Sequence, residues 1–368
     1  MTVTVRSFAK INLGLRIGAA REDGFHQLLT VYQTIGLHDV IRVDVGRGNG
    51  IEIRCADPRV PRDESNTCFR IVERAMQALR AKGRVVIEIE KRLPVQGGLG
   101  GASANAVATL LGLERALKKT LPTPERLRIA AEVGSDLPLF LVGGTILGVG
   151  RGEQVYPVPD LPAMPCVVVT PEVGVSTPKA FAAWDRLWGE GSCGAGTPAR
   201  EGLRESRLSA SDRESAELRS AGQPGAAVPT QTVAAKLTRA CSSDRMNELS
   251  RALSAWLSKP YSSAPSGFLG RGGRAGNPLL WLVRAGIEND FERVVFPEYP
   301  ELCEGKRALL RAGAKYASLS GSGSTLYGLF ASKAMAVQAA ARLRKQAWAA
   351  QATATLTRRS YWKRIVAG

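Results

Sequence analysis

Hydrophobic positions recur with two different periods along residues 1–158, which indicates strands and helices in close succession. Period-two alternation in TVTVRSFAKINLGLRI and in VYQTIGLHDVIRVDV predicts strands. Helical spacing in SNTCFRIVERAMQALRAKG and in TPERLRIAAEVG predicts helices that end at Gly83 and Gly134. An apolar run punctuated by glycines, SDLPLFLVGGTILGVGRGEQV, follows and is typical of a strand. The pattern predicts a domain that mixes strands and helices.

A proline-rich segment, YPVPDLPAMP at 156–165, marks the expected boundary between two domains, 1–158 and 159–368. Two domains also suit a chain of 368 residues, at ~100 to 200 residues each. After the boundary we expect a short strand, a helix from about Thr177 to Trp188, and, from residue 277, helices and strands that end with a strand in ATATLTRRS. This order predicts an α+β domain with an antiparallel sheet.

The segment 189–276 has a different composition, rich in Ser, Ala, Arg and Gly, as in GEGSCGAGTPAREG and SSAPSGFLGRGGRAG. Such segments bury too little apolar surface to offset the entropy lost on ordering. We therefore predict an insertion that is flexible at both ends, with one helix across VAAKLTRACSSDRMNELSRALSAWL.

The formal charge of +17, from 50 basic and 33 acidic residues, suits either nucleic acid or an anionic small substrate. The basic residues are spread along the chain and lack the interleaved aromatic residues of single-strand binding surfaces. Nucleic acid is therefore the weaker interpretation.

No apolar run approaches the ~20 residues that a membrane helix needs, and MTVTVRSFAK has no apolar signal core, so we expect a cytoplasmic protein without a membrane segment. Six cysteines without a CxxC pair, beside only two histidines, argue against a zinc site. We expect reduced thiols that mostly fill the core, and the sequence identifies no metal ligand.

Glycines are concentrated in KRLPVQGGLGGASANAVATL, residues 91–110, between a strand-like segment and a helix-like one. Glycine tolerates positive φ and allows a ligand to approach the main chain, and the N-terminus of the following helix favours an anion. The spacing matches neither of the two standard nucleotide-binding fingerprints. From this segment alone, a phosphate-binding loop and an ordinary strand-to-helix turn both remain open.

Three stretches resemble, in order and spacing, the GHMP kinase superfamily: SFAKINLGLRIGAAREDGFHQLLTVYQTI (7–35), KRLPVQGGLGGASANA (91–106) and GSDLPLFLVGGTILGVGRGE (134–153). Two more, TPEVGVSTPKAF and SLSGSGSTLYGLF, match its C-terminal half. The resemblance implies a two-domain α+β fold with the active site in the cleft between the N- and C-terminal domains. It implies ATP and Mg²⁺ as cofactors, and ATP-dependent phosphorylation of the 2-hydroxyl of 4-diphosphocytidyl-2-C-methyl-D-erythritol, a small-molecule intermediate of the non-mevalonate isoprenoid pathway.

The resemblance places the glycine segment around the phosphates of ATP. Gln96 and Ala102 depart slightly from the usual pattern, since small residues, mostly glycine, are common at both positions. The residues expected to bind ATP are Asn66, Lys91, Pro94, Val95, Gln96, Gly97, Gly98, Leu99, Gly100, Gly101, Ala102, Ser103, Ala104 and Asn105.

Lys10 and Asp136 match the two catalytic positions of the family. An alcohol is a poor nucleophile, so a carboxylate must accept its proton while a nearby ammonium keeps that carboxylate ionised. Taken without the resemblance, Lys10 could equally be a surface lysine and Asp136 a turn or capping residue.

The resemblance assigns the cytidine-bearing substrate to Asn12, Phe25, His26, Tyr32, Thr177 and Phe181. Flat rings can enclose a pyrimidine, and a histidine can read the edge of a base through hydrogen bonds. Core packing is the alternative for Phe25 and Phe181, and a surface histidine with satisfied hydrogen bonds is the alternative for His26. The turn Ser320–Ser324 matches a third glycine-rich motif, expected to close around the diphosphate end of the site.

Two other functions remain open at this stage. One is a kinase of the same superfamily for another alcohol, such as homoserine or mevalonate, which has no base to stack. The other is a basic nucleic-acid-binding protein that uses the Arg-rich insertion.

Overall fold

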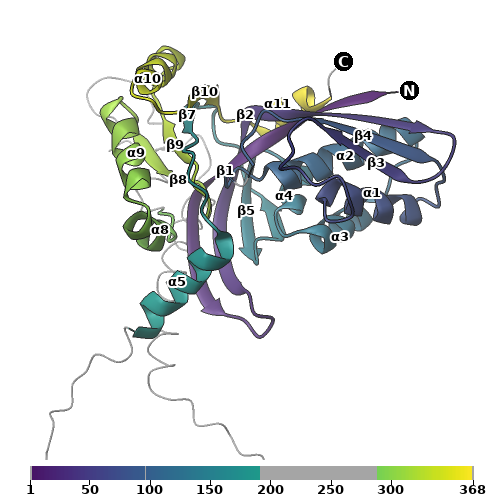
Figure 1. The fold of residues 1–368 in the computed structure, drawn as a ribbon, viewed down its shortest axis with the longest axis horizontal. Helices are drawn as coiled ribbons and strands as arrows, with labels where there is room; N and C mark the ends of the chain where they lie inside the picture. Colours follow the sequence, from purple (N-terminus) through teal and green to yellow (C-terminus); the bar gives the residue numbers. More distant parts are fainter. Residues whose placement is uncertain (1, 96, 191–287, 367–368) are drawn as a thin grey trace, which may run out of the picture.

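The computed structural model describes residues 2–95, 97–190 and 288–366, and one long hairpin organises it. Strands β1 (Val3–Ala20) and β2 (His26–Gly46) pair antiparallel along their whole length (Figure 1). The register shifts between Phe8 and Lys10 and again after Asn12. Such irregularities change the direction of neighbouring side chains and are common next to active sites. Here they occur where β1 carries two of the expected site residues.

The first half of the chain completes a six-stranded sheet on the other edge of β2, with helices packed on it. Its further elements are β3 (Ile51–Cys55), α1 (Thr67–Ala78), β4 (Arg84–Glu90), α2 (Gly101–Leu117), α3 (Thr123–Val133), α4 (Leu137–Val142), β5 (Thr145–Gly150) and β6 (Gln154–Pro157). Strand β4 pairs with the C-terminal part of β2, and β5 pairs with the N-terminal part. Helix α2 packs directly on β1 and β2 and is apolar on nearly all sides, because α1 and α4 cover it.

The second half forms a four-stranded antiparallel sheet in the order β10-β7-β9-β8. Its elements are β7 (Pro165–Val169), α5 (Thr177–Glu190), α8 (Glu292–Glu298), α9 (Pro300–Arg311), β8 (Tyr316–Leu319), β9 (Leu326–Leu329), α10 (Lys333–Lys345) and β10 (Ala350–Ala354). The antiparallel α+β arrangement predicted for this half is confirmed. The predicted helix from about Thr177 to Trp188 corresponds to α5.

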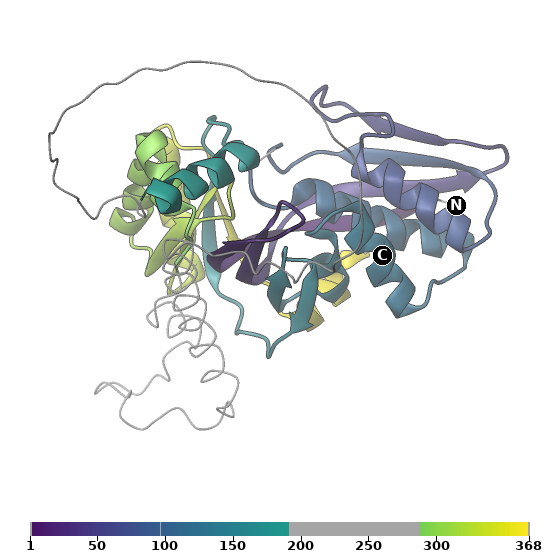
Figure 2. The same cartoon turned by 90° about the horizontal axis from the view of Figure 1, so that it is seen from below.

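Both faces of the second sheet are buried, but against different partners. Along β7, Val167 and Val169 belong to a core shared with the helices, whereas Cys166 and Val168 pack against the middle of the β1–β2 hairpin. Alternation along a strand sends successive side chains to opposite faces, so one strand serves both cores. In Figure 2 the hairpin turn accordingly lies between the blue first half and the green second half.

The chain end differs from the prediction of a strand across ATATLTRRS. Strand β10 ends at Ala354, and helix α11 (Arg358–Ile365) follows, with the Thr357 side chain accepting a hydrogen bond from the amide of Ser360. Tyr361 and Ile365, four residues apart, then share one buried face and pack into the core of the first half. Helix α11 packs against the first half, and the hairpin packs against the sheet of the second half. The domain boundary at 158/159 therefore stays a prediction from the sequence.

Several other expectations can be placed. The predicted insertion at 189–276, with its flexible ends and internal helix, lies outside the described residues apart from the last residues of α5. Within the described ranges, no helix is long and apolar enough to cross a membrane. The described cysteines, Cys55, Cys68, Cys166 and Cys303, are free thiols. All except Cys303 are buried, which agrees with the expected role in the core.

We predict that docking of α11 stabilises the first half substantially. Tyr361 is 2% exposed, its hydroxyl donates to the carbonyl of Phe140 (2.7 Å), and a Cβ at Gly143 would lie only 2.3 Å from its ring. Tyr361→Ala should lower the free energy of unfolding by about 3 to 5 kcal/mol, and Tyr361→Phe by only about 1 kcal/mol. Urea denaturation measures both values. An alanine variant as stable as the wild type would show that α11 contributes little to the fold.

Candidate active site

A cavity of about 950 Å³ lies where the two halves meet the hairpin, and its walls come from both. The ATP-site residues expected from the sequence line it, with two exceptions. Ala104 is buried in the core behind the wall, and its amide already donates to the carbonyl of Gly100 (2.8 Å). Gln96 lies outside the described residues. The substrate residues Asn12, Phe25, His26, Tyr32, Thr177 and Phe181 all line the same cavity.

Two glycine-rich loops form the floor of this cavity by direct contact between their main chains. Gly98 has φ +82°, and a Cβ there would lie 2.3 Å from the carbonyl oxygen of Ser320. A Cβ at Gly323 would lie 2.5 Å from the amide nitrogen of Gly98. The amide of Thr325 donates to the carbonyl of Gly97 (3.1 Å). Side chains would separate the loops, so glycine is required on both sides of the contact.

The first loop leads into helix α2 through Gly100, which has φ +69° and is the N-cap. No side chain in the described part of the chain caps this helix, so its first amides, at residues that line the cavity, have no side-chain partner. A Cβ at Gly100 would lie 3.1 Å from Cγ of Lys10. The loop therefore brings a helix N-terminus, a position that favours anions, close to the lysine side chain.

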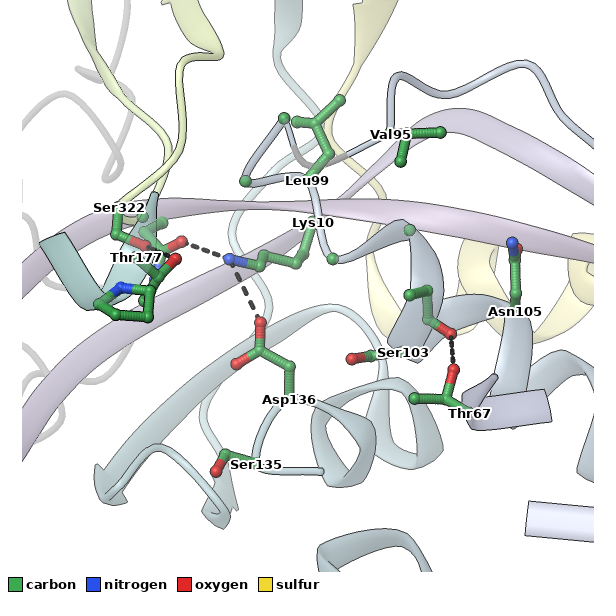
Figure 3. A pocket seen from close by; sticks show the side chains of 18 of the residues that line it. Lys10, Thr67, Val95, Leu99, Ser103, Asn105, Ser135, Asp136, Thr177 and Ser322 are labelled. Atoms are coloured by element: carbon green, nitrogen blue, oxygen red, sulfur yellow. Dashed lines mark hydrogen bonds and ion pairs between the residues drawn. The ribbon is translucent and has the colours of Figure 1, made fainter. Parts of the chain in front are cut away.

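Lys10 and Asp136 lie opposite each other in the cavity, as Figure 3 shows. Nζ of Lys10 lies 3.5 Å from a carboxylate oxygen of Asp136 and donates to Oδ1 of Asn12 at 2.7 Å. The Asn12 amide in turn donates to the Thr30 hydroxyl (2.8 Å). The lysine side chain is 5% exposed and the aspartate side chain 33%. The ammonium is thus held by two oxygen acceptors, while one side of the carboxylate remains open to the cavity.

The alternative roles of this pair do not fit the geometry. Lys10 is buried, so it is not a surface lysine. Asp136 occupies the N-cap position of α4, but its side chain makes no capping hydrogen bond and turns toward Lys10 instead.

Tyr32 lies beside this pair and not among rings that could enclose a base. Its hydroxyl donates to the second carboxylate oxygen of Asp136 (3.3 Å), and its side chain is only 2% exposed. Burial, reinforced by the charge of Asp136, raises the pKa of Tyr32 well above its usual range, so the phenol keeps its proton. Gly148 and Gly152 leave room for the ring. Strand β2 therefore places the Tyr32 hydroxyl at the Lys10 end of the cavity, and its expected contact with the substrate stays a prediction.

At the other end of the cavity, the rings of His26 and Phe181 stack with centroids 4.9 Å apart and planes at 15°. Phe181 also forms a T-shaped pair with the buried Phe291 ring. Phe25 is 50% exposed, and the guanidinium of Arg151 lies 4.9 Å from its ring centre. Since His26 already covers one face of Phe181, these two rings do not leave a base-sized gap between them.

Two of the expected nucleotide residues already have protein partners. Asn66 caps helix α1 by accepting a hydrogen bond from the amide of Cys68 (2.8 Å). The Lys91 ammonium pairs with Asp39, a fully buried carboxylate that also accepts from the amide of Leu93 (2.7 Å). These contacts fix the wall of the cavity. In contrast, the buried side-chain oxygen of Asn105 has no hydrogen-bond partner among the described residues.

Three residues of the site were missed by the sequence analysis: Asp39, Arg151 and Asp185. Asp39 could have been noticed as a lone acidic residue within the apolar strand segment TIGLHDVIRV. Asp185 follows Phe181 by four positions, which places the two on one face of α5. No local signal marks Arg151.

No cluster of three or more His, Cys, Asp or Glu side chains in the described ranges could hold a metal ion. The turn Ser320–Ser324, expected to close around the diphosphate end of the site, lies beside Lys10: a Cβ at Gly321 would lie 3.4 Å from Nζ of Lys10. The hydroxyls of Thr177 and Ser322 are hydrogen-bonded to each other (2.7 Å) across the cavity rim.

The chain matches two family models, the GHMP kinases N terminal domain at 66–144 and the GHMP kinases C terminal domain at 279–349. It is 33% identical to 4-diphosphocytidyl-2-C-methyl-D-erythritol kinase of Solibacter usitatus, over 89% of this chain and 80% of the relative. The identity is 31% to the enzyme of the same name from Acaryochloris marina, over 92% and 91%. The chain belongs to the 4-diphosphocytidyl-2-C-methyl-D-erythritol kinase family of GHMP kinases. The fold class predicted from the sequence is thereby confirmed.

Solved structures of GHMP kinases share the fold. A crystal structure of 4-(cytidine 5'-diphospho)-2C-methyl-D-erythritol kinase superposes with a TM-score of 0.62 at 25% identity, covering 96% of this chain and 98% of the other. A homoserine kinase from Cytophaga hutchinsonii superposes with a TM-score of 0.60 at 17% identity, covering 97% and 95%. The second match shows the common GHMP fold and does not distinguish substrates.

We predict that the contact between the two glycine loops tolerates no side chain. Gly98→Ala should lower the free energy of unfolding by at least about 1 to 2 kcal/mol, because alanine must adopt a left-handed backbone and meets Ser320. Gly46→Ala is the matched control, since it adds the same methyl group where no atom lies within 4 Å, and should change stability by less than about 0.5 kcal/mol. Equal urea midpoints for the two variants would contradict this account.

Proposed function

We propose that this protein transfers the γ-phosphoryl group of ATP to the 2-hydroxyl of 4-diphosphocytidyl-2-C-methyl-D-erythritol, a step of the non-mevalonate isoprenoid pathway. The observation that carries the proposal is that one cavity combines three features. A glycine-lined helix N-terminus and the Lys10–Asp136 pair adjoin each other, and the aromatic residues Phe25, His26 and Phe181 line the opposite end. The names of the relatives support the same substrate.

Asp136 is proposed as the general base. Lys10 and Tyr32 hold its carboxylate in position, and one side of the carboxylate remains accessible from the open part of the cavity. It would accept the hydroxyl proton as the alcohol oxygen attacks phosphorus. Lys10 favours the ionised carboxylate by its charge and stabilises the negative oxygen that forms. Asn12 and the main chain of Leu99 orient the lysine.

The residues of the first loop and helix α2 fit the triphosphate of ATP, because glycines at the wall let its oxygens reach main-chain amides. When bound, ATP supplies the transferred phosphoryl group. The unpartnered Asn105 oxygen, Asn66 and Lys91 lie further along the same wall and fit the nucleoside. No cluster of three or more His, Cys, Asp or Glu side chains in the described part of the chain could hold a metal ion, so Mg²⁺ would be held largely by the phosphates of ATP, as is common for this cation, with the Ser103 hydroxyl in the cavity wall as one available oxygen.

The test is an ADP-release assay with each candidate alcohol at equal concentration. We expect turnover with the cytidine-bearing substrate and little or none with homoserine or mevalonate, because neither can contact the aromatic end of the cavity. Turnover with homoserine or mevalonate that exceeds turnover with the cytidine compound would replace this proposal with another GHMP kinase activity.

We predict that Asp136→Asn lowers kcat by roughly 10²- to 10⁴-fold, because it removes the proton acceptor and keeps the shape of the side chain. The KM for ATP should stay within about twofold, since Asp136 is not placed against the nucleotide wall. Glu132→Gln, an equivalent change at a half-exposed ion pair with Arg128, is the control and should leave kcat unchanged. A kcat close to that of the wild type in Asp136→Asn would exclude Asp136 as the base.

A further inference from the structure

The structure holds His26 rigidly and leaves one edge of its ring for a ligand. The residue begins strand β2, its side chain is 9% exposed, and its ring lies flat on Phe181. Phe181 is held in turn by a T-shaped contact with the buried Phe291 ring. A ring fixed in this way cannot rotate to present a different hydrogen-bonding edge to a different base.

One ring nitrogen of His26 is hydrogen-bonded to Asp185. Nε2 lies 2.7 Å from Oδ1 of the Asp185 carboxylate. An ionised carboxylate only accepts hydrogen bonds, so Nε2 must carry the hydrogen. A neutral imidazole has one N–H, which leaves Nδ1 as a bare acceptor. Nδ1 has no hydrogen bond to any described residue.

Asp185 is suited to this role by its position on α5. It lies one helical turn after Phe181, so one helix supplies both the ring that supports His26 and the carboxylate that fixes its hydrogen. The carboxylate side chain is 56% exposed, and the contact with His26 is its one side-chain hydrogen bond within the described ranges. Nothing else in those ranges requires an acidic residue at this position.

An acceptor nitrogen at the base end of the cavity distinguishes cytosine from uracil. Cytosine presents an exocyclic amine, which donates, where uracil presents a carbonyl oxygen, which accepts. Uracil would therefore place one lone pair against another. We propose that Asp185 determines base specificity by holding His26 in the tautomer whose Nδ1 accepts a hydrogen bond from the exocyclic amine of cytosine. Asp185 is thus a positioning residue, and this inference rests on the proposed function.

The kinetic test compares 4-diphosphocytidyl-2-C-methyl-D-erythritol with its uridine analogue, at a pH of about 8, where an ordinary imidazole is neutral. Asp185→Asn removes the carboxylate, and its amide can donate to Nε2, so the tautomer is no longer fixed. The cytidine-to-uridine ratio of kcat/KM should fall by roughly tenfold or more, mostly through KM for the two acceptors. The KM for ATP should not change. Glu172→Gln, which also removes one exposed negative charge near the start of α5, should keep the wild-type ratio.

A spectroscopic test reads the tautomer without relying on activity. The chain has two histidines, His26 and His38, so ¹⁵N-histidine spectra of the wild type and a His38→Gln variant assign both rings. The wild type should show His26 protonated at Nε2 and bare at Nδ1, and Asp185→Asn should show a mixture.

Two results would overturn the inference. One is a hydrogen on Nδ1 of His26 in the wild type, and the other is an unchanged cytidine-to-uridine ratio in Asp185→Asn. Failure of the proposed function would look different, because the wild type itself would then release no ADP with the cytidine compound, and the inference would fall with it.

Discussion

The buried ammonium of Lys10 beside the Asp136 carboxylate is the interaction on which the arrangement of this site depends. A charge removed from water is costly unless opposite charge and hydrogen-bond acceptors surround it. Here Asp136 supplies the charge at 3.5 Å and Asn12 the acceptor at 2.7 Å. Because these residues come from β1 and from the start of α4, the hairpin and the helices must pack in one relative position for the lysine to be satisfied. The same packing exposes one side of the carboxylate to the cavity.

The two glycine loops lie against the same lysine through their main chains. The amide of Lys10 donates to Leu99 in the first loop, and a Cβ at Gly321 in the second loop would lie 3.4 Å from its ammonium. The loops also touch each other, and Asn289 fastens the second one by donating to the carbonyls of Leu319 and Gly321. The N-terminus of α2, a position that favours anions, is therefore fixed relative to the proposed base, which is the geometry that phosphoryl transfer needs.

Local patterns were sufficient to predict the features that depend on local residues. Periodicity predicted the hairpin strands, α1, α3 and α5, and the glycines at 97–101 predicted the strand-to-helix turn that the structure contains. Helix α11 was missed, because its helical signal is short and it is stabilised by tertiary contacts, among them those of Tyr361 with Phe140 and Phe8. The family resemblance, rather than any period, singled out Lys10 and Asp136.

The remaining features could not be predicted because they join residues distant in sequence. Asp39 meets Lys91 across 52 positions, and His26 meets Asp185 across 159. The position of Tyr32 could not be predicted in detail either. The sequence indicated an aromatic residue near the site, but the direction of its side chain toward Asp136 follows from the alternation along β2. Side-chain direction and long-range pairing, both products of tertiary packing, determine these roles.

The central claim is that Lys10 and Asp136 act as one catalytic unit, and a double-mutant cycle on kcat tests it most directly. The cycle compares Lys10→Met, Asp136→Asn and the double variant with the wild type. Residues that act as a unit are strongly non-additive, so the double variant should be about as slow as the slower single variant. If the logarithms of the two single losses simply add in the double variant, the two residues act independently and the account of the site is wrong.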